Sequence, residues 1–177
     1  TPVLGFSRSN VSSARQNIEH LQKAFFFTCV DRAGVLVFRL LGGSSARTLT
    51  ETDIGAYLGE TIQTPDIIPI QRQQEFELPR SITASYLNAD RDYEVGAQTW
   101  QRSVTNSRVV IADELAIVMT DTYALYSVHV RLNRAWIERT GLRFSTTMAH
   151  IALEPSDVIT VIAYSRTYKL RIDRKEI

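Results

Sequence analysis

The sequence has a single cysteine, few methionines and no long apolar run. Because Cys29 stands alone among the 177 residues, an internal disulfide and a zinc site with several cysteines are excluded. A membrane-spanning helix needs roughly 18 consecutive apolar residues. No run approaches this length, and the largely apolar stretch at residues 25–30 is short and stops at Asp31. We therefore expect neither a disulfide-stapled domain nor a membrane segment.

Signatures of catalysis and phosphate binding are missing as well. The three histidines have no HExxH-like spacing, and no Gly-x-Ser-x-Gly elbow occurs. The loop at residues 42–45, Gly-Gly-Ser-Ser, lacks the Lys-Ser/Thr pair that contacts phosphate and metal in a phosphate-binding loop. We interpret it as a flexible connection.

One stretch begins like a calcium-binding loop but does not continue as one. Asn88, Asp90 and Asp92 have the spacing of the first ligands. Tyr93 occupies the position that requires glycine, and Thr99 the position that requires a bidentate glutamate. A capped turn is the better interpretation.

Three further candidates have simpler explanations. Glu75 and Glu77 imitate a glycosidase carboxylate pair but fit solvent-facing strand charges. Cys29 fits a buried, inert thiol in an apolar strand. The alternation of Tyr and Arg/Lys at residues 164–171 resembles a single-strand nucleic-acid platform, yet no recognised module surrounds it. The sequence therefore predicts no catalytic, cofactor-binding or metal-ligating residue, and no sequence-specific nucleic-acid binding.

Composition and charge are those of an ordinary globular protein. Hydrophobic residues make up 44% and charged residues 22%, with a net charge of +1. Seventeen of the twenty basic residues are arginine, a side chain common at protein interfaces. From Arg131 onward, nine basic residues face five acidic ones, whereas the preceding segment has eleven against fourteen. This difference in net charge between the two segments could orient copies of the chain against each other. Alternatively, it reflects solvated surface charges without a role.

Local patterns predict a mixed α+β fold with antiparallel sheets. Ser12 or Ser13 begins a helix, and strands on either side of the Asp31–Gly34 turn form a hairpin. A short helix is expected from Thr50 to about Leu58. These elements form a small helix–hairpin–helix subdomain at residues 1–68.

The remaining segment, residues 69–177, is expected to be a β domain with one long helix. Alternation predicts a strand over residues 75–88, with a bulge or edge at Pro79. The helix is expected at about residues 113–139, with an apolar stripe from Leu115 to Ile137. Two further strands are expected at residues 158–164 and 167–172.

Residues 77–80, Glu-Leu-Pro-Arg, and residues 84–98 resemble the "LPR … Y … DYQ-G-Q" segment of phage tail and baseplate hub proteins. This family includes the host-specificity (tail-tip) protein of gene transfer agents. Residues 18–43 resemble its helix, aromatic strand and "FR…GG" hairpin. Residues 153–161 are similar to "LEPGDVVTV", with Ser156 in place of the usual glycine.

The resemblance implies an antiparallel β-barrel-like hub domain with an inserted α/β subdomain. It implies a structural role rather than an enzymatic one. Copies of the chain would form a ring, most simply a trimer, that joins the tail tube to the tip of a virion tail assembled in the bacterial cytoplasm. Its partners would be neighbouring tail tube and tail-tip proteins, and the helix with Trp136 could supply a contact between copies. The alternative is a carbohydrate- or receptor-binding module of the tail tip, which predicts an exposed aromatic platform.

Overall fold

The computed structural model describes residues 3–7, 13–32, 34–55 and 68–176. Those residues form two compact units that interleave along the chain. The first comprises Thr1–Phe26 and Arg72–Thr140, and the second comprises Phe27–Gln71 and Gly141–Ile177. This division differs from the contiguous segments 1–68 and 69–177 expected from the sequence. The chain leaves the first unit directly after its first helix and returns to it near residue 72.

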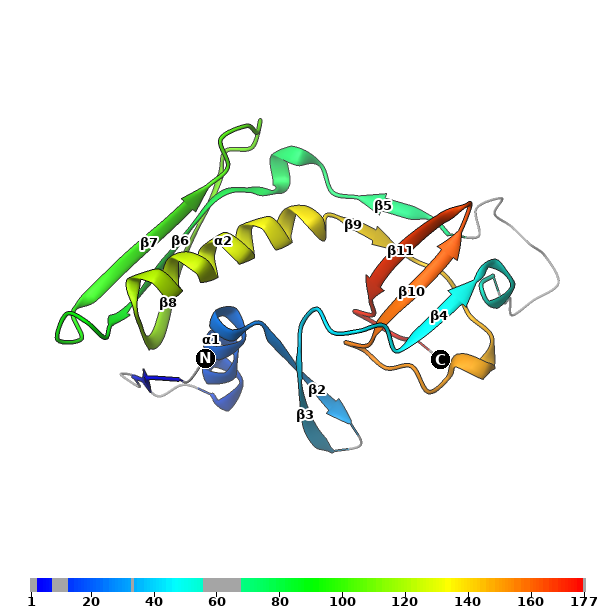
Figure 1. The fold of residues 1–177 in the computed structure, drawn as a ribbon, viewed down its shortest axis with the longest axis horizontal. Helices are drawn as coiled ribbons and strands as arrows, with labels where there is room; N and C mark the ends of the chain where they lie inside the picture. The colour runs from blue at the N-terminus through cyan, green and yellow to red at the C-terminus, as the bar shows by residue number, and fades with distance from the viewer. Residues whose placement is uncertain (1–2, 8–12, 33, 56–67, 177) are drawn as a thin grey trace. The chain divides into compact units, whose positions relative to one another are not determined.

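The first unit is a four-stranded sheet with two helices. Its strands are β1 (Gly5–Phe6), β6 (Pro79–Asn88), β7 (Val95–Gln101) and β8 (Val109–Met119), in the order β1-β8-β6-β7. β6 pairs parallel with β8 and antiparallel with β7. Figure 1 shows α2 (Asp121–Ile137) lying along this sheet. α1 (Ala14–Phe25) contacts both α2 and β8.

The core of the first unit lies between the sheet and the helices. Strand β6 supplies Ile82, Ala84 and Tyr86 from one face, as its alternation predicts. α1 adds Ala24, and α2 adds residues spaced three or four apart: Ala124, Val128, Leu132 and Trp136. The bulge predicted at Pro79 is confirmed as a register shift between Pro79 and Ser81.

The first helix begins where its capping residues predict. Ser13 accepts a hydrogen bond from the backbone N–H of Gln16, and the Gln16 side chain accepts one from the backbone N–H of Ser13. This reciprocal capping box satisfies N–H groups that have no partner within the helix. Phe26, at the other end, has a left-handed backbone with φ of 55°, and β2 begins at the next residue.

The long helix begins later than the sequence predicts. Residues 113–119 belong to β8, and α2 begins at Asp121 with Thr120 as its cap. β-Branched residues at positions 109–111 and 117–118 favour a strand there. Thr120-Asp121 is the true start signal, because the Thr120 hydroxyl accepts from the backbone N–H of Tyr123 at 3.3 Å. The predicted apolar stripe is also misplaced, since Tyr126 and Ile137 are exposed.

The second unit is built from small sheets. β2 (Phe27–Arg32) and β3 (Val35–Leu40) form the predicted antiparallel hairpin, with Gly34 at a φ of 83° in its turn. A three-stranded sheet has the order β11-β10-β4, from Arg166–Arg171, Val158–Ala163 and Arg47–Thr50. Its buried face packs Leu49, Ile159, Val161 and Ala163 with Ile54 and Ile68.

Short elements complete the chain. β5 (Ile70–Arg72) pairs with β9 (Thr140–Leu142), near the residues where the chain passes from one unit to the other. Three 3-10 turns are η1 (Glu51–Asp53), η2 (Glu75–Glu77) and η3 (Met148–His150). The helix expected after Thr50 is described only as η1, and its continuation lies outside the described residues. Residues 75–77, expected in the strand, form η2 instead.

The expected barrel is wrong for this chain. The described strands form one four-stranded, one three-stranded and two two-stranded sheets, and none of these closes on itself. Residues 113–119, which were expected in the helix, belong to β8, and β8 lies between β6 and β1 in the sheet. The mixed α+β class is confirmed. Among the described residues, no helix has the length and apolar character needed to cross a membrane.

Candidate functional site

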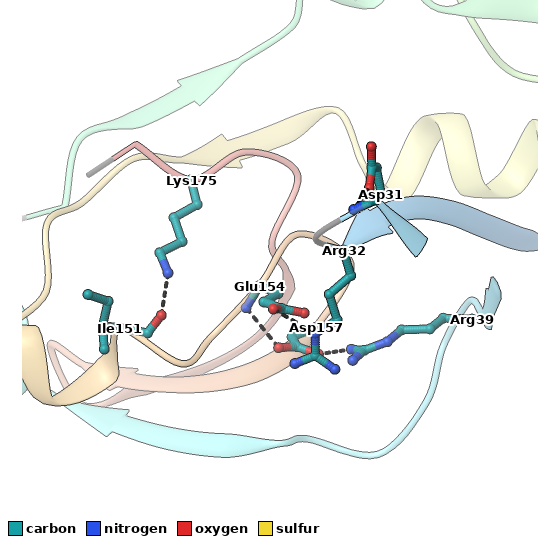
Figure 2. Close-up of polar contacts among 8 residues, drawn as sticks. Asp31, Arg32, Arg39, Ile151, Glu154, Asp157 and Lys175 are labelled. Carbon is teal, nitrogen blue, oxygen red and sulfur yellow. Dashed lines mark hydrogen bonds and ion pairs between the residues drawn. The ribbon is translucent and has the colours of Figure 1, made fainter. Parts of the chain in front are cut away.

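The turn that precedes β10 is fixed by its own residues. The backbone N–H of Glu154 donates to Asp157 Oδ2 at 2.9 Å, and the N–H of Asp157 donates to the Glu154 carbonyl at 3.1 Å. The Asp157 carboxylate thus holds the turn and keeps its second oxygen, Oδ1, for a partner outside it. Nearby, Lys175 donates to the carbonyl of Ile151 (Figure 2).

Two arginines from the hairpin bind this turn. Arg32 Nε donates to Glu154 Oε1 at 2.8 Å, and the Arg39 guanidinium donates to Asp157 Oδ1. Figure 2 shows both side chains reaching the turn. We call Arg32, Arg39, Glu154 and Asp157 the arginine clasp. Since Arg32 lies opposite Val35 and Arg39 opposite Thr28, both arginines project from the same hairpin face.

The clasp turn contains a strained residue. Ser156 has a φ of 73°, a left-handed conformation that favours glycine. Its backbone N–H donates to the Ile172 carbonyl at 2.7 Å, and the N–H of Ile172 donates to the Asp157 carbonyl at 2.9 Å. The Ser156 hydroxyl is buried and has no hydrogen-bond partner among the described residues. Ser156 therefore occupies a position whose backbone conformation favours glycine.

In the first unit, Asp121 joins the helix to the sheet. Its Oδ1 accepts from the Tyr86 hydroxyl and, at 2.7 Å, from Asn88 Nδ2. Its Oδ2 accepts from Arg91 at 3.0 Å. Burial, together with the bond to Asp121, raises the pKa of Tyr86. Asp121 is the first residue of α2, where a negative charge also favours the helix dipole.

A second carboxylate, Asp113, joins both helices to β8. It accepts from Lys23 Nζ at 2.7 Å and from the Arg131 guanidinium. Burial by itself would raise the pKa of Asp113, but the hydrogen bonds and charges of Lys23 and Arg131 outweigh it and lower that pKa. This carboxylate is therefore kept ionised by the fold.

The calcium-like stretch is a capped turn in the structure. The Asn88 side-chain oxygen accepts from the backbone N–H of Asp90 at 2.8 Å, and its Nδ2 is bonded to Asp121. Asp92 and Tyr93 have left-handed backbones, with φ of 48° and 63°. No group of three or more His, Cys, Asp or Glu residues suited to a metal occurs in the part of the chain that the structure describes.

The histidines and the cysteine lie in different settings. His129 packs its ring edge-on to Trp100, with 4.7 Å between ring centroids. His150 is buried, and its Nε2 lies 3.3 Å from Asp53 Oδ1. The pKa of Asp53 is lowered by hydrogen bonds from the Thr50 backbone and hydroxyl and by His150. Cys29 is half-buried on β2 rather than fully buried as expected.

The two remaining candidates also serve the fold. Glu75 accepts from the backbone N–H of Asn106 at 3.0 Å and from the Thr105 hydroxyl at 3.1 Å, and these bonds lower its pKa. The stretch at residues 164–171 forms a tight turn and β11, and Tyr168 packs against the core of the second unit. Along β11, Tyr168 shares a face with Arg166 and Leu170, whereas Lys169 and Arg171 lie on the opposite face.

Trp136 belongs to the interior of the first unit. Its indole N–H donates to the Pro79 carbonyl at 2.9 Å, and Arg102 stacks 4.3 Å from its ring centroid. Its side chain is buried, and the expected contact between copies through its helix stays a prediction. Trp100, on the edge strand β7, is the more exposed tryptophan, at 38%.

Sequence reasoning missed the arginine clasp and the two carboxylate junctions. Arg32 and Glu154 are 122 residues apart, and Arg39 and Asp157 are 118 apart. No periodicity or spacing connects residues at such distances. The turn at Asp157 and the arginine excess were visible signals, but pairing them requires the fold.

Asp113, Asp121, Glu154 and Asp157 bind turns, helix starts and neighbouring strands. The chain belongs to the phage tail protein family, because residues 13–175 match the family model described as "Putative phage tail protein". It is a phage tail-type protein.

A solved structure supports this membership. The chain is similar to a chain from the virion of a native gene transfer agent particle, with a TM-score of 0.84 and 26% sequence identity. The match covers 98% of this chain and 38% of that one. This chain therefore spans well under half the length of the virion chain it matches. No curated protein sequence matches it.

Proposed function

We propose that this protein is a structural component of the tail tip or baseplate hub in a phage or phage-like particle, where it joins the tail tube to the tip. The observation that carries the proposal is the match to a virion chain along 98% of the sequence at a TM-score of 0.84. Fold likeness of this extent at 26% identity supports a shared place in the particle. The family match over residues 13–175 agrees with it.

In this proposal, copies of the chain form a ring, most simply a trimer, between tail tube and tail-tip proteins in the virion tail. A ring requires a heterologous contact in which two different surfaces meet. The uneven charge supports such a contact, since the segment from Arg131 onward is basic and the preceding one is acidic. Assembly takes place in the bacterial cytoplasm.

The role is structural rather than enzymatic. A catalytic carboxylate needs a lone pair directed at a substrate. Asp121 accepts from three side chains, Asp113 from two and Asp157 from Arg39 and a backbone N–H. These acids are used by the fold itself, which supports an assembly component without cofactor or metal.

Quantitative mass spectrometry of purified particles tests the proposal. Particles from the source strain are banded on a density gradient, and tails are then separated from capsids. We expect peptides of this protein in the tail fraction at a few copies per particle, with an abundant tail-tube protein as the internal control. Tails rich in tube peptides but without this chain contradict the proposal. A tag visible by electron microscopy then tests whether the protein lies at the tip or along the tube.

A second candidate is a carbohydrate-binding module of the tail tip. Trp100 favours it, because this half-exposed ring lies on an edge strand beside His129, and Asn133 lies 2.8 Å from that imidazole. An aromatic face with neighbouring hydrogen-bonding groups suits a sugar ring. A glycan array with the wild type and the Trp100→Ala variant separates the two functions. Binding that Trp100→Ala abolishes supports the carbohydrate role, and no binding by either protein leaves the structural one.

A further inference from the structure

The two faces of the β2–β3 hairpin differ in chemistry. One face carries Arg32 and Arg39, which the arginine clasp ties to the turn before β10. The opposite face carries Leu36, Phe38 and Leu40 of β3, each more than half exposed. Its only charged residue is Asp31, whose carboxylate accepts from the backbone N–H of Gly34 at 2.9 Å. The clasp thus fixes the hairpin in a position that leaves an apolar face uncovered among the described residues.

The outer edge of β3 is also unpaired in the part of the chain that the structure describes. β2 and β3 form a sheet of two strands only, and a two-stranded ribbon is marginally stable in water. An exposed apolar edge strand is a template for pairing with another chain. Because Arg32 and Val35 close a two-residue loop, they form the pair that exchanges backbone hydrogen bonds. The ladder then alternates, so Leu36, Phe38 and Leu40 direct their backbone N–H and C=O groups to the free edge.

The order of side chains along this edge is symmetric. Leu36 and Leu40 lie two residues before and two residues after Phe38. A second β3 strand placed antiparallel about Phe38 would therefore set Phe38 opposite Phe38, and Leu36 opposite Leu40, on one continuous face. The free edge of β2 lacks this property. There the corresponding order is Phe27, Cys29, Asp31, so the same pairing would place a carboxylate opposite an aromatic ring.

We propose that β3 pairs edge to edge with β3 of a second copy of this chain, forming a four-stranded sheet β2-β3-β3-β2 about a two-fold axis at Phe38. About six backbone hydrogen bonds would join the copies. The face of Leu36, Phe38 and Leu40 then becomes continuous across both copies, with like side chains in contact. The second copy is the occupant that the symmetric order selects, because an unrelated strand would not require it.

This contact is separate from the ring of the proposed function. A two-fold contact uses the same surface on both copies, whereas a ring uses two different surfaces. A single edge pairing also buries less than the roughly 800 Å² per partner of a standard stable interface. We therefore expect association that is weak and concentration-dependent for the isolated chain, so trapping by disulfide is the suitable measurement.

The register of the proposed β3–β3 pairing predicts a specific pattern of disulfide crosslinks. Hydrogen-bonded antiparallel partners have Cα atoms about 5.5 Å apart, within the range that a disulfide spans. All variants carry Cys29→Ser, which removes the native thiol. In that background Phe38→Cys should crosslink to itself. Leu36→Cys mixed with Leu40→Cys should give the mixed dimer, while either variant alone should not.

Val37→Cys is the matched control, because Val37 lies on the opposite face and would oppose residue 39 of the second copy. Crosslinking of Phe38→Cys and of the mixed Leu36→Cys and Leu40→Cys sample, without Val37→Cys, supports the pairing. Equal crosslinking at all positions, or none at any position, overturns it.

Sedimentation of uncrosslinked protein provides an independent readout. Phe38→Lys places like charges opposite each other at the axis and should abolish the concentration-dependent increase in sedimentation coefficient. Val35→Lys, an exposed position on the clasp face, should leave that increase unchanged. Circular dichroism checks that both variants fold. Loss of association in both variants, or in neither, overturns the proposal. The particle experiment is unaffected by either result, so the two proposals can fail separately.

Discussion

The two units of the chain reach stability by different means. In the first, twelve buried residues from both helices and the central strands form one core. In the second, six buried residues form a smaller core beneath the three-stranded sheet, and the hairpin is attached by ion pairs. Because apolar burial is the dominant favourable contribution to folding, the first unit should depend on its interior. The second should depend more on polar contacts and on surfaces that remain open.

The use of charge differs in the same way. In the first unit, Asp113 and Asp121 lie where helices meet strands that are already packed together. In the second, Glu154 and Asp157 hold a ribbon whose described residues lie outside the core of that unit. A carboxylate therefore reinforces a core in one unit and attaches a ribbon that lies outside the core in the other. A ribbon held by its polar face leaves its apolar face available.

The largest expected effect separates the two leucine environments. Leu132 is 1% exposed beneath the sheet. Leu132→Ala should lower the unfolding free energy by about 2–5 kcal/mol, because the substitution leaves a cavity. Leu40, 78% exposed on the hairpin, should change it by less than about 0.5 kcal/mol. Urea unfolding of both variants at a protein concentration too low for self-association checks the contrast. Similar losses for the two leucines would contradict it.

Next in size is the loss of Asp113. Asp113→Asn removes the charge that Lys23 and Arg131 share and should cost about 1–3 kcal/mol. Because the folded pKa of Asp113 lies below its ordinary value of 3.8, its ionic contribution is present above that pH. It is lost as pH falls through the folded pKa.

Unfolding free energies of wild type and Asp113→Asn from pH 6 to pH 3 measure this dependence. The difference between them should shrink below pH 3.8. Other acids with lowered pKa values, Asp53 and Glu75, are common to both proteins, so the difference reports Asp113. A difference that stays constant down to pH 3 would show that Asp113 contributes no ionic stabilisation.

Local signals in the sequence predicted four strands of the second unit. The hairpin, its Gly34 turn and the two C-terminal strands follow from turn residues and short alternating runs. The first unit was predicted less well, because residues 109–139 hold two adjacent apolar elements. The apolar residues of the buried strand β8 are followed almost directly by those of α2. Their combined spacing therefore resembles the pattern of one long helix. Thr120-Asp121 was the signal that distinguishes them.

Contacts between distant residues could not be predicted. The arginine excess was visible, but nothing near Arg32 or Arg39 in the sequence indicates Glu154 or Asp157. Trp136 is a residue whose setting the sequence alone did not decide. A tryptophan near a helix end is compatible with an interface or a core, and only the Pro79 carbonyl and the covering Arg102 decide for the core. The closed barrel came from family resemblance alone.

A smaller effect is expected from breaking the arginine clasp. Arg39→Met keeps the length of the side chain and removes its charge, and Asp157→Asn neutralises the partner. Each should weaken hairpin attachment, with a coupling of about 0.5–1 kcal/mol in a double-mutant cycle because the pair is partly exposed. Hydrogen exchange is the suitable measurement, since local opening precedes global unfolding. Faster exchange should appear in β2 and β3 and not in β6, and equal acceleration in both would contradict the contrast between the units.

A gain of similar size is expected at Ser156. Ser156→Gly should raise the unfolding free energy by about 0.5–1 kcal/mol, because glycine adopts a φ of 73° without the Cβ penalty. The substitution also removes a buried hydroxyl that lacks a hydrogen-bond partner among the described residues. Ser156→Ala separates these causes, since it removes the hydroxyl and keeps the Cβ. Stabilisation by glycine but not by alanine assigns the strain to the backbone, and equal stabilisation by both assigns it to the hydroxyl. Either gain in unfolding free energy would show that Ser156 destabilises the turn that the arginine clasp holds. A loss with glycine would mean that Ser156 is not strained there.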